Sequence, residues 1–214
     1  AHHGRGGLMY ATRLALQNAI IAETLRSGDS SFTALCAEFI TRAERRMFAG
    51  LRPLRAREME TRSTLTITAG VGATPTGFLQ ARRLTWVATV PYKLIYRDPE
   101  DFYDQTGAYA RATIYTIDGT VINVLSPDTG TATLSYYATP TALTADNSTH
   151  TTLTAHGHVY LAGALLEAYE YLDDPPKTAK WEQRFLEAIE GVNLAAVKAR
   201  YSGTNLAPRI PGAA

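Results

Sequence analysis

Seven arginines and no lysine lie within a 21-residue stretch of this 214-residue chain. They are Arg42, Arg45, Arg46, Arg52, Arg55, Arg57 and Arg62. A guanidinium group binds carboxylates or phosphates through two parallel hydrogen bonds, and it loses its hydration more readily than an ammonium group. Because Glu44, Glu58 and Glu60 are interspersed, the stretch favours a protein–protein interface. Ion pairing within the chain and contact with nucleic acid are the alternative interpretations.

A second group that could do chemistry is a set of acidic side chains around Pro99. These are Asp98, Glu100, Asp101 and Asp104. Such acids could share a metal ion in a metal-dependent hydrolase. They also have an ordinary explanation, because acidic residues that follow a proline complement the positive end of a helix dipole. We favour the helix start and predict no metal site here.

The remaining candidates for catalysis are isolated. His156 and His158 are two positions apart, so on a regular helix they point roughly 200° apart and cannot ligate a metal from one face. We expect these residues and His150 to lie at a helix start. Cys36 lies on an apolar helical stripe, which is typical of a core thiol. The glycine-rich stretch 70–77 lacks the residues of a nucleotide-binding loop. The sequence predicts no catalytic residue, metal ligand or cofactor.

Composition narrows the class of protein. The net charge is +1 and hydrophobic residues make up 45% of the chain, as in an ordinary globular domain. The single cysteine excludes an internal disulfide. By segment, residues 1–62 carry 10 basic and 6 acidic side chains, residues 63–154 carry 5 and 7, and residues 155–214 carry 6 and 7. The near-zero total therefore conceals a basic N-terminal part.

No apolar run approaches the roughly 20 residues that cross a bilayer, so we expect no membrane segment. Residues 1–8 show no signal peptide, and we interpret them as a flexible leader or a tag remnant.

Helices are expected at both ends of the chain. Apolar residues recur with a helical period over residues 9–26, 31–49, 155–172 and about 177–201. Ser27–Ser30 separates the first two helices, and Asp173–Pro176 ends the third and begins the fourth. A short helix is expected from Asp98 to Gln105.

The middle of the chain is predicted to be sheet. Of 28 threonines, 22 lie between residues 61 and 154, and threonine favours strands. Strands are expected at 64–68, 84–90, 92–96 and 131–138, with a loop over 69–77. Asp118 and Gly119 separate two β-branched runs and predict a two-residue hairpin. Turns this short imply antiparallel pairing.

These elements predict an α+β fold: a helical bundle of two N-terminal and two C-terminal helices with an inserted antiparallel β domain and an extended C-terminal tail. The expected limits are 1–8 for the leader, 9–62 for the N-terminal helices, 63–150 for the insert, 151–203 for the C-terminal helices and 204–214 for the tail.

Several short segments, in their order and spacing, resemble the head–tail adaptor proteins of tailed bacteriophages and gene transfer agents, also called connector or head-completion proteins. The resemblance covers about residues 9–209. It rests on Phe39–Arg46, Gly77–Leu84, Tyr115–Gly119, Leu134–Ala138, Tyr160–Ala168 and Leu172–Asp174 with Trp181.

The resemblance implies a non-enzymatic virion protein of the neck, assembled in the host cytoplasm. Such proteins form a dodecameric ring beneath the portal, bind a tail, stopper or nozzle protein on the other face, and continue the channel for packaged DNA. The hairpin at Asp118 and Gly119 would then face the tail. The arginines from Arg42 to Arg57, with Asn205 and Arg209 of the tail segment, would contact other subunits or the portal. A nucleic-acid-binding module using residues 42–62 and the hydrolase are the alternatives.

Overall fold

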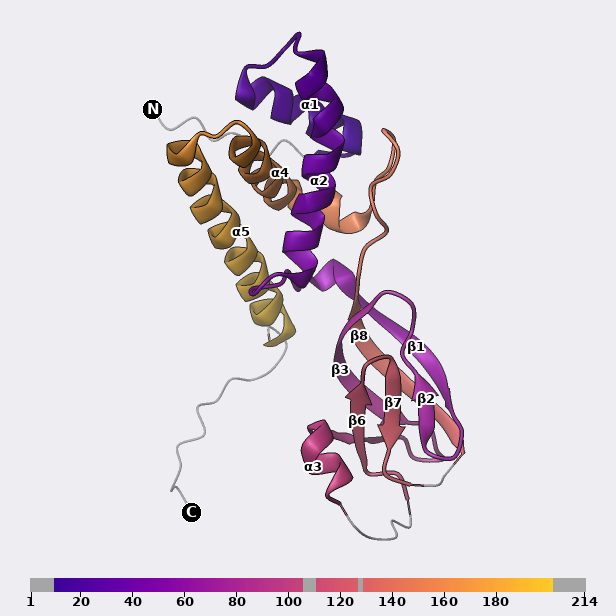
Figure 1. The fold of residues 1–214 in the computed structure, drawn as a ribbon. Coiled ribbons are helices and arrows are strands. Elements are labelled where there is room, and N and C mark those ends of the chain that lie inside the picture. The colour runs from indigo at the N-terminus through magenta and orange to yellow at the C-terminus, as the bar shows by residue number, and fades with distance from the viewer. Residues whose placement is uncertain (1–9, 106–110, 127–128, 202–214) are drawn as a thin grey trace. The chain divides into compact units, whose positions relative to one another are not determined.

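A computed structural model describes residues 10–105, 111–126 and 129–201 and shows an α+β chain (Figure 1). The chain divides into two compact units. We call residues 1–57 with 142–214 the helical unit, and residues 58–141 the β unit.

The helices agree with the sequence prediction in number and order. The described residues contain α1 (Arg13–Thr24), α2 (Ser30–Ala49), α3 (Pro99–Tyr103), α4 (Thr151–Tyr171) and α5 (Pro175–Tyr201), with one 3-10 turn at Arg57–Met59. The caps are those that the sequence suggested: Asp98 Oδ1 accepts the Glu100 N–H, and Asp174 Oδ1 accepts the Lys177 N–H.

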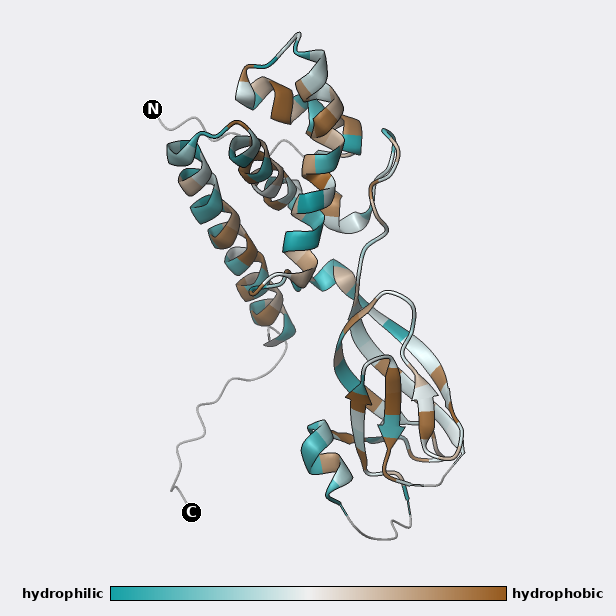
Figure 2. Cartoon of the chain, in the orientation of Figure 1, coloured by the Kyte–Doolittle hydropathy of each residue, from teal (hydrophilic) through white to brown (hydrophobic). Residues whose placement is uncertain are grey.

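Helix α4 is the centre of the helical unit. It packs against α1, α2 and α5, and thirteen of its residues are buried. A helix that is apolar around most of its circumference is stable only when other elements cover it. By contrast, hydrophobic and hydrophilic residues alternate along α5 (Figure 2), as expected of a helix with one solvent-exposed face.

The packing of α4 depends on a glycine. A Cβ atom placed on Gly163 would lie 2.9 Å from Cε2 of Phe185 in α5 and 3.0 Å from Cβ of Ala43 in α2. Both distances are shorter than ordinary van der Waals contact. Gly163 therefore permits a close approach of α4 to two neighbouring helices at the same level.

The start of α4 differs from the prediction. The helix begins at Thr151, four residues before the expected Ala155, because the ring of His150 acts as its N-cap. His150 Nδ1 accepts the Leu153 N–H at 3.1 Å. The backbone of His156 is non-helical, with φ −130° and ψ 34°, so the first turn is kinked away from the remaining helix. We predicted the start of this helix from the regular spacing of its apolar residues. The kink at His156 interrupts that spacing, so the turn before it was not recognised.

The β unit consists of two four-stranded sheets. The first has the order β1–β8–β3–β4, with strands Glu60–Ile67, Gly130–Ala138, Phe78–Trp86 and Tyr92–Lys93. The second has the order β2–β7–β6–β5, with strands Val71–Ala73, Val121–Val124, Ile114–Asp118 and Ile95–Tyr96. One apolar core is shared by the strands of both sheets, and β6 and β7 are its most hydrophobic strands in Figure 2.

The predicted insert is not purely antiparallel. Strand β5 pairs with β6 in parallel, through Ile95 with Ile114 and Tyr96 with Tyr115. The connection between them contains α3, so it is long enough for the crossover that parallel strands need. The other strand pairs are antiparallel.

Three strand limits were also wrong. The predicted loop 69–77 contains β2, because Thr68 and Val71 exchange two backbone hydrogen bonds across a tight turn. The strand expected at 84–90 is β3 at 78–86. Its register shifts between residues 78 and 80 and between 81 and 83 break the alternation of side chains. The strand expected at 92–96 is split between the two sheets as β4 and β5.

We predict that Gly163→Ala destabilises the chain by roughly 1–3 kcal/mol, because the new methyl group overpacks the contact with Ala43 and Phe185. Gly191→Ala is the matched control: it lies in α5, where a Cβ meets nothing within 4 Å. The control should be neutral or gain up to about 1 kcal/mol from helix propensity. Urea unfolding measures both, and equal stability of the two variants would contradict the assigned role of Gly163.

Candidate interaction surfaces

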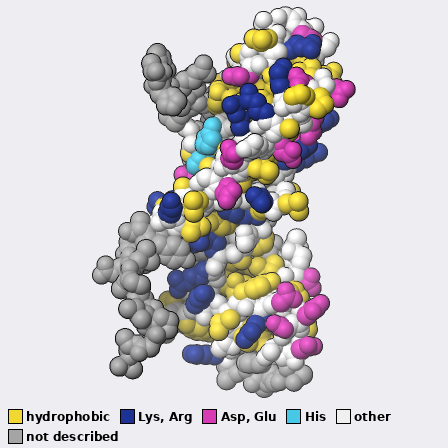
Figure 3. Space-filling model, turned by 90° about the vertical axis from the view of Figure 1, so that its left-hand side faces the viewer, with side chains coloured by type: hydrophobic (Ala, Val, Ile, Leu, Met, Phe, Trp, Pro, Cys, Tyr) yellow, Lys and Arg dark blue, Asp and Glu magenta, His cyan; other side chains and the backbone are white. Residues whose placement is uncertain are grey.

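The helical unit carries an intermixed charged surface. In Figure 3, Lys and Arg side chains lie among Asp, Glu and hydrophobic side chains rather than forming a continuous basic track. A mixture of this kind is more typical of protein interfaces than of surfaces that follow a phosphate backbone.

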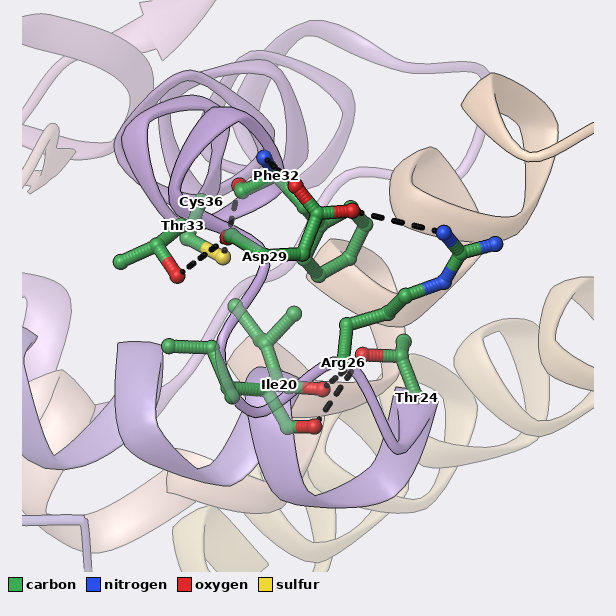
Figure 4. A network of polar contacts seen from close by, with 8 residues as sticks. Ile20, Thr24, Arg26, Asp29, Phe32, Thr33 and Cys36 are labelled. Atoms are coloured by element: carbon green, nitrogen blue, oxygen red, sulfur yellow. Dashed lines mark hydrogen bonds and ion pairs between the residues drawn. The ribbon is translucent and has the colours of Figure 1, made fainter.

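A network of polar contacts holds the start of α2 (Figure 4). Asp29 Oδ1 accepts the Phe32 N–H at 3.0 Å, and the Asp29 backbone carbonyl accepts the Thr33 hydroxyl at 2.9 Å. Arg26 forms an ion pair with the Asp29 carboxylate at 3.4 Å. One turn later, the buried Cys36 thiol donates to the Phe32 carbonyl, and burial raises its pKa to about 11. Cys36 is therefore a core thiol, as predicted.

Two arginines of α2 are used in ion pairs within the helical unit. Arg42 pairs with Glu38 one turn earlier on the exposed face of α2. Arg46 reaches α4, where it forms ion pairs with Glu167 and, at 2.7 Å, with Glu170. Glu167 is only 4% exposed. Burial raises the pKa of Glu167, and the neighbouring guanidinium of Arg46 opposes that rise.

Arg55 is held by the turn that follows α2. Its backbone N–H donates to Asn193 Oδ1 in α5 at 2.7 Å, and its guanidinium donates to the Leu54 carbonyl at 2.8 Å. Asn193 also donates to the Pro53 carbonyl at 3.1 Å. The amide of Asn193 thus fastens this turn to α5.

The other three predicted interface arginines are exposed. In the described part of the chain, Arg45, Arg52 and Arg57 have no ion-pair partner. The structure therefore separates the cluster into arginines that pair within the chain and arginines that are available to a partner. Their role at an interface stays a prediction.

An apolar groove lies beside Arg46 and Arg52. It has a volume of about 480 Å³ and is lined by the end of α2, the following turn, α4 and α5. Its lining residues are Arg46, Gly50, Leu51, Arg52, Leu166, Glu182, Phe185, Leu186 and Ile189. Leu51 is fully exposed and Leu186 is 37% exposed. Exposed leucines with a border of arginines form the kind of surface that another protein covers.

This groove could not be found from the sequence. Leu51 stands alone between Gly50 and Arg52, outside any periodic pattern, and Leu186 looks like one more apolar position of a long helix. The packing of both α2 and α5 against α4 brings these residues together.

The sequence model of the SU10 adaptor protein family matches residues 11–209. The chain belongs to the SU10 adaptor protein family. This is a family of phage head–tail adaptors, so membership confirms the resemblance found in the sequence and indicates a structural protein of the virion. A search of curated proteins returned no match. No helix within the described residues is long and apolar enough to cross a membrane.

In this adaptor, the acidic residues around Pro99 lie at the two ends of α3. Asp98 caps the start of the helix, Glu100 and Asp101 are exposed in its first turn, and Asp104 is the C-cap residue. Among the described residues, no three His, Cys, Asp or Glu side chains are arranged to hold a metal ion.

The histidines have different positions. The kink in α4 brings the rings of His156 and His158 to 6.2 Å, edge to face, which the assumption of a regular helix did not anticipate. His150 Nε2 lies 3.3 Å from the hydroxyl of Tyr160 and 3.9 Å from Oε1 of Glu44. Because Nδ1 accepts the cap hydrogen bond, the neutral ring carries its proton on Nε2. This buried cluster of His150, Tyr160 and Glu44 was missed in the sequence because its members come from distant segments.

The predicted hairpin is present in the adaptor, and its contact with a tail component stays a prediction. Asp118 is the last residue of β6 and pairs with Val121 of β7, so the turn is formed by Gly119 and Thr120, one residue later than the predicted Asp118 and Gly119. Gly119 has φ +58°, and a Cβ placed on it would meet nothing within 4 Å. All three residues from Asp118 to Thr120 are exposed. Asn205 and Arg209, the other predicted contact residues, lie outside the described residues and stay predictions.

We predict that Arg46→Met destabilises the adaptor at neutral pH by about 1–3 kcal/mol. The loss is smaller than for a fully buried pair because Arg46 is partly exposed. Without Arg46, the pKa of Glu167 rises further above its unfolded-state value. Stability is then greatest below the unfolded-state pKa and falls as the pH rises through the folded-state pKa.

The difference in stability between wild type and Arg46→Met should therefore shrink as the pH is lowered, as urea unfolding across a pH series would show. Arg45→Met is the matched control, since it removes an exposed arginine of the same helix that has no ion-pair partner among the described residues. The assignment fails if the two variants lose equal stability, or if the loss for Arg46→Met is independent of pH.

Proposed function

We propose that this adaptor is the repeated subunit of a ring in a phage neck, joining the portal to the next tail component and continuing the DNA channel. Membership of the adaptor family supports a structural role. The observation that carries the finer proposal is the apolar groove at Leu51 and Leu186, with Arg46 and Arg52 beside it.

A closed ring explains why such a groove is exposed in one chain. In a cyclic assembly each subunit offers one surface to one neighbour and a different surface to the other, so every groove is covered once. A modest contact is then repeated at each interface. We propose a dodecamer, the number implied by the resemblance to connector proteins.

The exposed arginines supply the polar part of these contacts. Arg45, Arg52 and Arg57 suit carboxylates of a neighbouring subunit or of the portal, because a desolvated guanidinium needs a matching acid. The same three residues are what a nucleic-acid-binding module would use. Glu182, an exposed acid that lines the same groove as Arg52, weighs against a phosphate-binding surface.

We also propose that the β6–β7 hairpin meets the tail-side component. Its turn is exposed, and the short strands β6 and β7 are held firmly by a core that includes Tyr115, Ile122 and Val124. A rigid support with an exposed turn can be inserted into a partner without unfolding the unit that carries it.

Leu51→Asp is expected to prevent ring formation, because it places a charge in the apolar contact. Since Leu51 is fully exposed, the fold should be unchanged. Val90→Asp is the control, at a residue that is 76% exposed in the β unit. Mass photometry with the portal as template should show assembled adaptor for wild type and Val90→Asp, and unassembled adaptor for Leu51→Asp.

Two results would contradict this proposal. One is assembly of Leu51→Asp at wild-type protein concentration, which would show that the apolar groove is not the contact between subunits. The other is duplex binding by the isolated wild-type chain with a steep salt dependence, about −0.9 in log–log slope per phosphate contacted, which would favour the nucleic-acid module.

For the hairpin, we predict that replacing Asp118 with Lys leaves ring assembly intact and weakens capture of the tail-side component by about tenfold or more, as loss of a central interface contact does. Co-sedimentation of pre-formed rings with that component measures the effect. Asp146→Lys makes the same charge change at an exposed position of the helical unit and should have no effect. If both variants capture the tail-side component equally well, the hairpin is not part of that interface.

A further inference from the structure

The β unit has a second groove, lined by aromatic side chains. Its volume is about 460 Å³, and it is formed by β3, β5 and β6. The lining residues are Phe78, Gln80, Ala81, Arg82, Tyr96, Tyr115 and Ile117. A volume of this size lies in the range of sites that hold a ligand.

The aromatic rings of the groove are held in fixed positions. Tyr96 and Tyr115 pack edge to face with centroids 5.5 Å apart, and Phe78 packs against Tyr136 at 5.7 Å. Tyr115 is buried, whereas Tyr96 is 50% exposed. The groove is thus a preformed apolar slot with one accessible aromatic side.

Among the described residues, Arg82 is the only cation in the lining, and it is neutralised. Arg82 forms an ion pair with Glu60, and its guanidinium lies over the ring of Tyr137 at 5.7 Å from the centroid. The groove therefore suits a ligand surface that is apolar and uncharged.

Strand pairing decides how a peptide would lie there. β3 pairs with β4 only at Thr85 and Trp86, and β6 pairs with β5 only at Ile114 and Tyr115, so the two sheets part where the groove lies. The two register shifts in β3 make this edge a poor template for a regular added strand. Aromatic slots instead suit a polyproline II peptide, which needs no ladder of hydrogen bonds.

The chain itself contains such a peptide sequence. After α5 it continues with Leu206-Ala207-Pro208-Arg209-Ile210-Pro211. Two pairs of an apolar residue followed by proline, Ala207-Pro208 and Ile210-Pro211, recur three residues apart, which is the length of one polyproline II turn. This spacing is the sequence pattern that aromatic-lined grooves bind.

We propose that the aromatic groove of the β unit binds the Ala207–Pro211 segment of a neighbouring copy of this chain. In a ring, each subunit then contributes one groove and one segment, and the contact latches neighbouring subunits together. Delivery by a neighbour depends on the proposed ring, whereas binding of the segment to the groove does not. This destination differs from the portal contact expected for Arg209 from the resemblance.

The test uses the full chain carrying Pro208→Ala and Pro211→Ala, so that its own segment does not compete. A fluorescent peptide of residues 204–214 is added, and anisotropy is measured. We expect saturable binding, and a peptide with both prolines replaced by alanine should not bind. A peptide with Arg209→Gln should bind as the unmodified peptide does.

Groove variants locate the site. Tyr96→Ala should weaken peptide binding by about tenfold or more, the effect of truncating an aromatic anchor. Tyr103→Ala is the matched control, since Tyr103 is a 58% exposed tyrosine of α3 that does not line the groove. Thermal unfolding checks that both variants fold.

The proposal is overturned if the peptide shows no saturable binding up to about 1 mM, the effective concentration that a short tether supplies. It is also overturned if the alanine-substituted peptide binds equally, or if Tyr96→Ala and Tyr103→Ala behave alike. Ring assembly without peptide binding would leave the proposed neck function standing and remove only the latch. Peptide binding without a ring would retain binding of the segment to the groove and would remove the proposed neck function together with the latch between neighbours.

Discussion

The close approach of α4 to α2 and α5 is the contact on which the helical unit depends. Gly163 allows it, because a Cβ there would be 3.0 Å or less from atoms of Ala43 and Phe185. This approach brings Arg46 of α2 within reach of Glu167 and Glu170 of α4. It also sets α5 beside the end of α2, where the apolar groove forms. One packing contact therefore fixes both the charge pairing and the exposed surface.

The arginines of the arginine-rich stretch fall into two groups, those that form ion pairs within the chain and those that are exposed. Burying a carboxylate such as that of Glu167 costs free energy of folding unless the charge is paired. Arg46 therefore stabilises the folded chain by pairing with Glu167. Arg45, on the preceding position of the same helix, is exposed and has no ion-pair partner among the described residues. The helical period thus separates structural arginines from those available to a partner, although all of them look alike in the sequence.

The sequence predicted the helices well because their signals are local. Asp29, Asp98 and Asp174 cap the helices that follow them, and the apolar period of residues 31–49 is regular. The strands were harder to place. Two register shifts interrupt the alternation in β3, and residues 92–96 contribute to two sheets. The two grooves could not be predicted, because tertiary packing alone brings their lining residues together. The groove of the helical unit joins Leu51 to Leu186, and the groove of the β unit joins Phe78 to Tyr96.

The family assignment and the surface of the helical unit support the proposed account, in which neighbours in a ring at the portal would cover the exposed groove and the arginines that have no ion-pair partner among the described residues. Electron microscopy of the adaptor together with its portal tests this most directly. The account predicts a closed ring of this chain beneath the portal, with Leu51 and Arg52 buried between adjacent subunits and an open central channel. A reconstruction in which the chain does not form a ring, or in which Leu51 remains exposed to solvent, would contradict it.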